Sequence, residues 1–179
     1  FQIRVNNRKI LNGFYAMLGL TEQSGAIMRT VDKLDKIGPD KVRDLLLSDC
    51  GLREDQAAEI LKFIAITGSN AEVLAALEGY MGRHELFDTG LSELKTVVKY
   101  LADFGVPEEN FAVDLTIARG LDYYTGTVYE TTLLDHPEIG SVCSGGRYDN
   151  LAEYYTDRPL PGVGISLGLT RLFYVLNEQ

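Results

Sequence analysis

Several residue types are scarce in this chain of 179 residues, and each scarcity excludes a class of protein. The chain has no tryptophan, two histidines and two cysteines. Two cysteines fit neither a disulfide framework nor a metal-binding motif, so we expect a reducing compartment and no protein metal site. No apolar run reaches the roughly 18 residues of a membrane helix, and no leader precedes the first strand-like run. We therefore expect a cytoplasmic protein without a membrane segment.

Positive charge is also scarce, because the formal net charge is -9. This balance argues against nonspecific nucleic-acid binding, which depends on Lys and Arg to neutralise phosphates. Residues 1–105 hold 13 basic and 15 acidic side chains, whereas residues 106–179 hold 4 and 11. Any contact with nucleic acid is therefore expected from the first part of the chain.

The last part of the chain contains arginine but no lysine, and three of its four arginines lie in glycine-containing motifs. Arg119 stands in ARGLDYYTG, Arg147 in SGGRYD, and Arg171 at the end of GVGISLGLTR. A guanidinium is planar and permanently charged, so it suits phosphate or carboxylate groups. Glycine lets a ligand approach the backbone. The pattern predicts a binding site in residues 106–179.

The hydrophobic periodicity divides the chain into three parts and predicts an α+β fold. A strand and a helix are expected in 1–23, short amphipathic helices in 24–105, and strands with short links in 106–179. Strands that follow one another through short links favour an antiparallel sheet, and a third strand is expected over 141–144. The middle part is interpreted as an inserted all-helical subdomain.

The first two arginine motifs each have a structural and a functional interpretation. Arg119 either pairs with a carboxylate such as Asp122 at a strand end, or faces developing phosphate charge beside Tyr123 or Tyr124. The Gly-Gly pair before Arg147 either makes a tight turn into a helix, or admits a ligand against the backbone while Tyr148 offers its hydroxyl.

The third motif has three glycines, at Gly162, Gly164 and Gly168. Their spacing does not match a dinucleotide fingerprint. The surroundings of Ser166 match the nucleophile elbow of hydrolases, but that chemistry needs a histidine after the serine, and both His84 and His136 precede it. The third interpretation is a glycine-lined strand under a flat base, with Arg171 at a helix start reaching the phosphates.

These motifs resemble the middle of histidyl-tRNA synthetase, a class II aminoacyl-tRNA synthetase, over essentially the whole chain. Arg119–Tyr124 resembles the first histidine-specific motif of that family, Ser144–Asp149 the second, and Gly162–Arg171 resembles motif 3. Phe1–Leu11 is similar to the strand and helix after motif 2, and the helical part resembles the insertion domain. The fold implied is an antiparallel sheet fragment of a class II catalytic domain with a helical insertion.

The resemblance also implies roles for individual residues. Arg119 would neutralise the α-phosphate while the histidine carboxylate attacks ATP, and Tyr124 and Tyr148 would hydrogen-bond the imidazole. Arg171 would contact ATP, near Gly168. The other residues expected around the histidine are Tyr123, Gly145, Gly146, Gly162 and Gly164.

The partners implied are histidine, ATP with Mg²⁺, and tRNA(His), and the full-length protein is expected to be a homodimer. Motif 1, motif 2 and an anticodon-binding domain do not occur in the sequence, so we expect the fragment alone to be inactive. The basic residues of the helical part are expected at the tRNA acceptor stem, although a solvated mixed-charge face is the alternative. A synthetase-like regulatory paralogue, which binds histidine or a partner enzyme without charging tRNA, is the alternative function.

Overall fold

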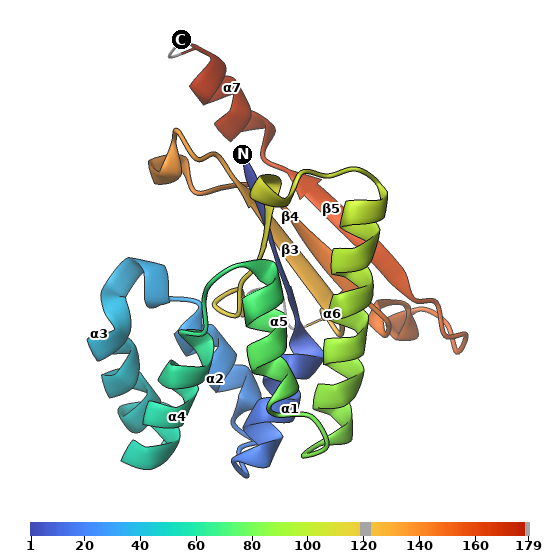
Figure 1. The fold of residues 1–179 in the computed structure, drawn as a ribbon. Coiled ribbons are helices and arrows are strands. Elements are labelled where there is room, and N and C mark those ends of the chain that lie inside the picture. The colour runs from blue at the N-terminus through green and yellow to red at the C-terminus, as the bar shows by residue number, and fades with distance from the viewer. Residues whose placement is uncertain (119–122, 178–179) are drawn as a thin grey trace.

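The computed structural model describes residues 1–118 and 123–177, which form a five-stranded sheet with helices packed mainly on one side (Figure 1). The strands are β1 (Gln2–Asn7), β2 (Phe111–Val113), β3 (Thr127–Thr132), β4 (Ser141–Tyr148) and β5 (Gly162–Leu167). The helices are α1 (Arg8–Met17), α2 (Ser24–Val31), α3 (Leu34–Ser48), α4 (Glu54–Ile64), α5 (Asn70–Glu78), α6 (Glu85–Asp103) and α7 (Leu169–Asn177). Short 3-10 turns lie at η1 (Glu108–Asn110), η2 (Pro137–Ile139) and η3 (Leu151–Tyr154).

The sheet has the strand order β2-β1-β3-β4-β5, and it is mixed. The expected α+β class is confirmed, and the pairs β1–β3, β3–β4 and β4–β5 are antiparallel. The pair β1–β2 is parallel, which corrects the expectation of a purely antiparallel sheet. The helices α1 to α6 lie between these two strands, and parallel neighbours require such a long crossover.

The glycines of β4 lie inside a strand, which corrects the expectation that the strand ends before them. The strand runs from Ser141 to Tyr148, and Gly145 and Gly146 both pair with β3 on one side and β5 on the other. Sequence reasoning favours a turn at a Gly-Gly pair, because glycine loses more conformational entropy than any other residue when it is ordered in a strand. Here the neighbouring strands come too close for a side chain.

Strand register defines two faces of the sheet, because successive side chains point to opposite sides. On one face, Val5 pairs with Tyr129 and Tyr129 with Gly145. Val5 is part of the hydrophobic core and Tyr129 packs against it, so the helices cover this face. The opposite face carries Arg4 beside Glu130, and it is the face that presents the polar groups.

The helices α1 and α6 pack closely because each has a glycine at the contact. A Cβ on Gly13 of α1 would lie 2.5 Å from the backbone nitrogen of Phe87, and one on Gly90 of α6 would lie 2.7 Å from that of Ile10. The ring of Phe14 stacks on that of Phe63 in α4 at 3.9 Å between centroids. The core of the helical part is therefore continuous with α1 and β1. The boundary at residue 23 stays a prediction.

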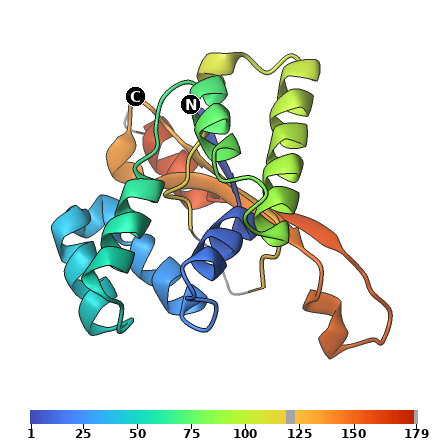
Figure 2. The ribbon, with the colours of Figure 1, turned by 60° about the horizontal axis from the view of Figure 1, so that its bottom comes forward.

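The last two elements extend away from this core. Figures 1 and 2 show α7 projecting from one end of the sheet, and the β4–β5 connection projecting from the opposite end. Large apolar side chains on both β5 and α7 are exposed: Val163, Ile165, Leu167, Leu169, Phe173, Tyr174 and Leu176. Among the described residues, no helix is both long and apolar enough to span a bilayer.

Candidate functional site

Three tyrosines meet at the end of the sheet where β4 ends and β5 begins. The ring centroids of Tyr123 and Tyr124 are 4.7 Å apart, and those of Tyr123 and Tyr148 are 5.8 Å apart in an edge-to-face arrangement. Tyr148 is on β4, whereas Tyr123 and Tyr124 precede β3. All three side chains are partly buried.

A row of small residues makes room for these rings. Strand register places Asn6, Val128, Gly146 and Gly164 side by side across four strands. A Cβ on Gly146 would lie 2.9 Å from the Tyr124 ring and 2.7 Å from the carbonyl oxygen of Thr127. A Cβ on Gly162 would lie 2.4 Å from the Tyr148 ring. The tyrosines therefore lie directly on the glycine backbone.

Burial changes the acidity of this cluster. Burial is the main reason that the pKa of Tyr124 rises to about 12, and a hydrogen bond and charge interaction with Tyr123 add to it. Burial likewise raises the pKa of Tyr129. Tyr124 therefore keeps its proton at neutral pH and can donate it to a nitrogen or oxygen acceptor.

An aspartate fixes the loop that carries the tyrosines. Thr125 donates from Oγ1 to Asp149 at 2.6 Å, and Arg147 donates from Nε to the same carboxylate at 2.9 Å. The backbone nitrogen of Thr125 also donates to the carbonyl oxygen of Arg147 at 2.9 Å. The Thr125 hydrogen bond is the largest cause of the lowered pKa of Asp149, with the Arg147 hydrogen bond and charge adding to it against the effect of burial.

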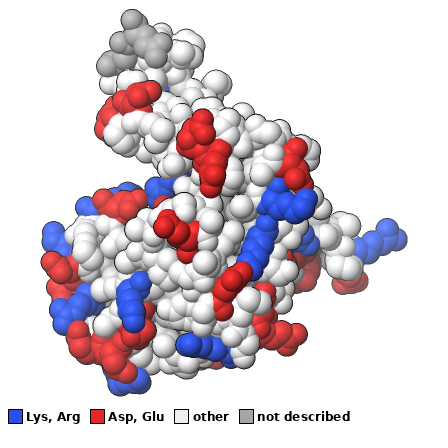
Figure 3. Space-filling view, in the orientation of Figure 1, with Lys and Arg blue, Asp and Glu red and all other residues white. Residues whose placement is uncertain are grey.

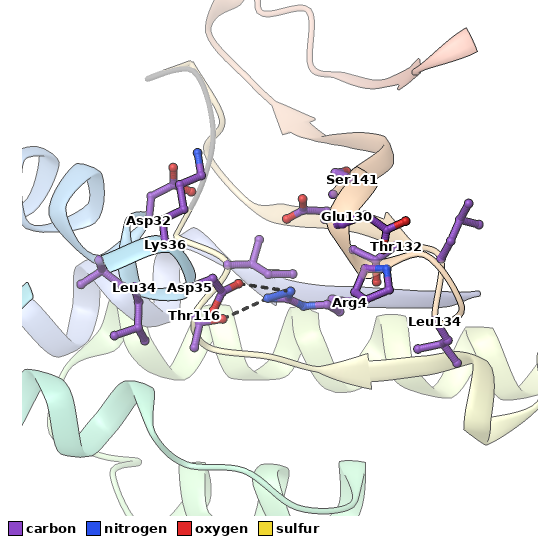
Figure 4. A pocket seen from close by; sticks show the side chains of 16 residues that line it. Arg4, Asp32, Leu34, Asp35, Lys36, Thr116, Glu130, Thr132, Leu134 and Ser141 are labelled. Carbon is purple, nitrogen blue, oxygen red and sulfur yellow. Dashed lines mark hydrogen bonds and ion pairs between the residues drawn. The ribbon is translucent and has the colours of Figure 1, made fainter. Parts of the chain in front are cut away.

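A second concavity of about 480 Å³ lies on the same face of the sheet, toward its other end (Figure 4). Its floor holds Arg4, whose guanidinium donates to Asp114 at 2.8 Å and Thr116 at 3.1 Å and lies 3.6 Å from Asp35. Glu130 and Ser141 line it from β3 and β4. The lining carries charges of both signs, which suits a polar ligand that has both donors and acceptors.

Arg171 and Gly168 lie at this other end of β4. The Arg171 guanidinium donates to the carbonyl oxygen of Ser141. The backbone nitrogen of Gly168 donates to the carbonyl oxygen of Val142 at 2.8 Å. Ser141 and Tyr148 are seven residue steps apart along the strand, which corresponds to roughly 23 Å. Arg171 and the tyrosines are therefore at opposite ends of one strand.

A family model of histidyl-tRNA synthetase matches residues 1–172. The chain belongs to the histidyl-tRNA synthetase family. A histidine–tRNA ligase of Clostridium tetani is 54% identical over 178 residues, which is 99% of this chain and 40% of that protein. One of Xanthomonas axonopodis pv. citri is 52% identical over 185 residues, with 39% of its length covered. The chain thus spans about 40% of the length of these relatives.

Solved structures agree with this assignment. The crystal structure of histidyl-tRNA synthetase from Nostoc sp. PCC 7120 has a TM-score of 0.92 and 46% identity, and the match covers 99% of this chain and 42% of that one. A protein from Bacillus halodurans, described as an ATP phosphoribosyltransferase regulatory subunit/histidyl-tRNA synthetase, has a TM-score of 0.74 at 22% identity over 98% of this chain and 44% of its own. The second likeness shows the fold alone.

The structure brings together most of the site residues expected from the family motifs. Tyr123, Tyr124 and Tyr148 form the cluster, with Gly146, Gly162 and Gly164 beneath them. Gly145 points to the helix-covered face, where its neighbours are Tyr129 and Gly164. Arg171 and Gly168 stand apart, as described above. Arg119 lies outside the described residues, so its role in the family site stays a prediction.

Sequence reasoning missed a set of polar residues that support the candidate site. Asn6 is fully buried and donates from Nδ2 to the carbonyl oxygen of Ile117 at 2.9 Å. Asp114 accepts from the backbone nitrogen of Thr116 at 2.8 Å and from Arg4. These contacts fix the segment that leads to Arg119. The available signal was the alternation in β1, where Arg4 and Asn6 lie between apolar residues; the second half of this strand is buried.

The described part of the chain contains potential metal ligands, but they do not form a cluster. Within residues 1–118 and 123–177, no group of three or more His, Cys, Asp or Glu side chains is placed to hold a metal ion. Cys50 is buried and Cys143 is partly buried, and both are free thiols.

Proposed function

We propose that this chain is the central part of the catalytic region of a histidine–tRNA ligase, with residues 1–23 and 106–179 in the catalytic sheet and 24–105 as a helical insertion. The full-length protein would activate histidine with ATP and then charge tRNA(His). The observation that supports this most is the tyrosine cluster, in which Tyr124 and Tyr148 lie on the glycines of β4 and β5. Family membership suggests the reaction, and the cluster offers phenol groups of suitable chemistry.

Histidine recognition would rest on the phenols. A neutral imidazole has one donor and one acceptor nitrogen, and a neutral phenol can serve either one. Tyr124, whose pKa is raised to about 12, is a neutral phenol at neutral pH, as an ordinary tyrosine is, and it would donate its proton. Gly146 and Gly164 let the rings of Tyr124 and Tyr148 lie directly on the sheet, which would fix the positions of the phenols that receive the ligand.

The chemistry would take place at the α-phosphate of ATP. A carboxylate oxygen of histidine attacks this phosphorus, the bond to the bridging oxygen breaks, and pyrophosphate leaves. Arg119 would neutralise the charge on the phosphoryl oxygens, a contribution of about 3 to 4 kcal/mol by analogy with oxyanion-hole donors. Arg171, beside Gly168, would hold the nucleotide. In the second step the terminal ribose hydroxyl of tRNA attacks the acyl carbon and AMP leaves.

The remaining partners follow from this reaction. Mg²⁺ would arrive on the ATP phosphates, since magnesium binds through substrate phosphates and few protein carboxylates. We also propose that the full-length enzyme is a homodimer and that it works in the cytoplasm, where charged tRNA is used. The exposed apolar side chains of β5 and α7 are consistent with further protein packing there.

Pyrophosphate exchange dependent on histidine tests the first step, and charging of tRNA(His) tests the second. We expect both from the full-length protein, and neither from residues 1–179 alone. Arg119→Ala in the full-length protein should lower the exchange rate by roughly 100- to 1,000-fold while histidine affinity changes little. Histidine binding without exchange or charging would favour the regulatory paralogue, and full exchange by the fragment would refute its expected inactivity.

A further inference from the structure

Two serines lie opposite each other on the face of the sheet that carries the tyrosine rings. Strand register pairs Ser144 of β4 with Ser166 of β5. The Cβ atoms of such a cross-strand pair are about 4.5 to 5.5 Å apart, so both hydroxyls can reach one ligand group. Neither hydroxyl makes a hydrogen bond to another residue in the part of the chain that the structure describes. Both are therefore able to donate to a ligand.

Ser166 lies midway between the two side chains that are proposed to hold the substrates. A Cβ on Gly164 would lie 3.2 Å from the Tyr148 ring, and one on Gly168 would lie 3.6 Å from Cδ of Arg171. Ser166 is two residues from each of these glycines, and two residues of strand correspond to roughly 7 Å. Any ligand that extends from the tyrosines to Arg171 must therefore pass over Ser166.

The position of Ser166 within a strand removes the hydrolase interpretation of its motif. A nucleophile elbow places the serine on a sharp turn between a strand and a helix. Ser166 instead lies inside β5, where it pairs with Ser144, and α7 begins only at Leu169. Ser166 is exposed and Ser144 is partly buried, so a ligand can reach both. The serines are thus suited to binding a ligand and not to attacking it.

An anionic group at this place depends on local hydrogen-bond donors. The chain carries a formal net charge of -9, and the surface seen in Figure 3 has acidic side chains among the basic ones. The row that contains the serines continues through Glu130 on β3 to Arg4 on β1, so it holds charges of both signs. Long-range attraction of an anion is therefore weak. A serine hydroxyl can donate to an anionic oxygen without adding a charge of its own.

We propose that Ser166 and Ser144 donate hydrogen bonds to the α-phosphate oxygens at the point where histidine and ATP are joined, an inference that rests on the proposed function and deepens it. Histidine is proposed at the tyrosines and the nucleotide at Arg171, so the reacting phosphate lies between them. Ser144 and Ser166 are the side chains that β4 and β5 present there on this face. Both hydroxyls keep their protons while the carboxylate attacks phosphorus and pyrophosphate leaves. The serines are thus substrate-binding residues for the first step.

The test compares two ligands on the full-length enzyme and its Ser166→Ala variant. Histidinol keeps the imidazole but has no phosphate, whereas histidinol adenylate, a phosphodiester of histidinol and AMP, keeps the α-phosphate. The dissociation constant of histidinol adenylate should rise about tenfold in Ser166→Ala, as expected for one lost hydrogen bond to a charged group, and that of histidinol should stay unchanged. Ser144→Ala should act in the same direction. Ser166→Thr, which keeps a hydroxyl, should bind both ligands nearly as the unmodified enzyme does.

Kinetics give a second readout that partial unfolding would not reproduce. In Ser166→Ala, kcat for histidine-dependent pyrophosphate exchange should fall about tenfold while KM for histidine stays unchanged, because the hydrogen bond strengthens as charge develops on the phosphoryl oxygens. Ser92→Ala, at an exposed position on α6, is the matched control and should leave exchange and both dissociation constants unchanged. All variants should unfold at the same urea concentration as the unmodified enzyme.

The remaining outcomes separate this inference from the proposed function. An equal loss of affinity for histidinol and histidinol adenylate would place the contact on the amino-acid part and overturn the inference. A rise in KM for ATP, with histidinol adenylate bound normally, would assign the serines to the pyrophosphate part and overturn it as well. Unaltered binding and exchange in both alanine variants would refute the inference while the ligase function stands. If the unmodified enzyme showed no exchange, the ligase function itself would fail, and this inference with it.

Discussion

The Tyr129 hydroxyl donates a hydrogen bond of 2.6 Å to the carbonyl oxygen of Gly164, two strands away. The side chain crosses β4 at Gly145, where a Cβ would lie 2.5 Å from the Tyr129 hydroxyl and 2.1 Å from the Gly164 oxygen. Tyr129 packs against the hydrophobic core, so this bond ties β5 to the helix-covered face. Gly145 thus has a packing role in addition to the substrate contact expected from its motif.

Removing this hydroxyl should weaken the sheet. Tyr129→Phe leaves the ring in place and deprives the Gly164 oxygen of its donor, so we expect the free energy of unfolding to fall by about 1 kcal/mol. Urea unfolding of the chain measures it, and the slope m should not change. Tyr100→Phe, at a ring that is 54% exposed, serves as the control and should have no effect. Equal effects of both variants would contradict the role given to Tyr129.

Adding a methyl group at Gly145 should cost more than removing the hydroxyl. A Cβ there meets backbone and phenol atoms that cannot all move, and overpacking of this kind costs about 1 to 3 kcal/mol or more. Gly145→Ala should therefore lower the unfolding midpoint in urea more than Tyr129→Phe does. The matched control is Gly25→Ala on α2, whose Cβ would be 3.5 Å from the Arg29 side chain. That variant should keep or raise stability, because alanine favours helix.

The Asp149 carboxylate should contribute stability that depends on pH. Its pKa is lowered in the folded chain, chiefly by the hydrogen bond from Thr125, so the unfolded state binds its proton at a higher pH. The contribution is complete above the ordinary aspartate pKa and is lost as pH falls through the lowered value. Asp149→Asn should be less stable than the unmodified chain at pH 6, and the difference should shrink below about pH 4.

Carbon-13 NMR of the carboxyl group measures the Asp149 pKa directly. Thr125→Val should raise that pKa, because it removes the main hydrogen bond to the ionised form. Asp157→Asn, in the β4–β5 connection, is a control for a general charge effect and should leave the Asp149 pKa in place. An unchanged pKa in Thr125→Val would show that Arg147 alone holds the carboxylate.

ATP binding should depend on the planar shape of the Arg171 guanidinium as well as on its charge. In the full-length enzyme, Arg171→Lys keeps the charge but loses the fork that donates to the Ser141 oxygen. We expect KM for ATP to rise about tenfold in Arg171→Lys and further in Arg171→Ala, with KM for tRNA(His) unchanged. Steady-state pyrophosphate exchange measures KM for ATP, and the charging reaction measures KM for tRNA(His), with the exposed Arg158→Lys as the control. A normal KM for ATP in Arg171→Ala would remove Arg171 from the nucleotide site.

Part of the site could be foreseen because its chemistry is local in sequence. The arginine, tyrosine and glycine motifs indicated the histidyl-tRNA synthetase family. Tyr124 and Tyr148, which were expected in one site, lie together in the structure. The strand pattern after Pro107 was also sufficient, since Phe111, Val113, Leu115 and Ile117 are all buried as their alternation predicts.

Other features could not be foreseen because they depend on partners distant in the chain. No local signal distinguishes Gly145 from Gly146, yet one faces Tyr129 and the other faces Tyr124. Their roles follow from the register between β3, β4 and β5, and a shift of one residue would exchange them. The support of Arg4 by Asp114 likewise joins residues that are 110 positions apart.

By itself, the sequence determined the chemical groups of this protein, the alternation that gives each strand two faces, and the family to which the motifs belong. Tertiary structure decided that β2 runs parallel to β1, which glycine lies under which ring, and that Asp114, at the end of the neighbouring strand, binds Arg4. The physical reason is that side-chain type and local periodicity are properties of neighbouring residues. Register, close approach and shared charge arise only when distant segments pack together.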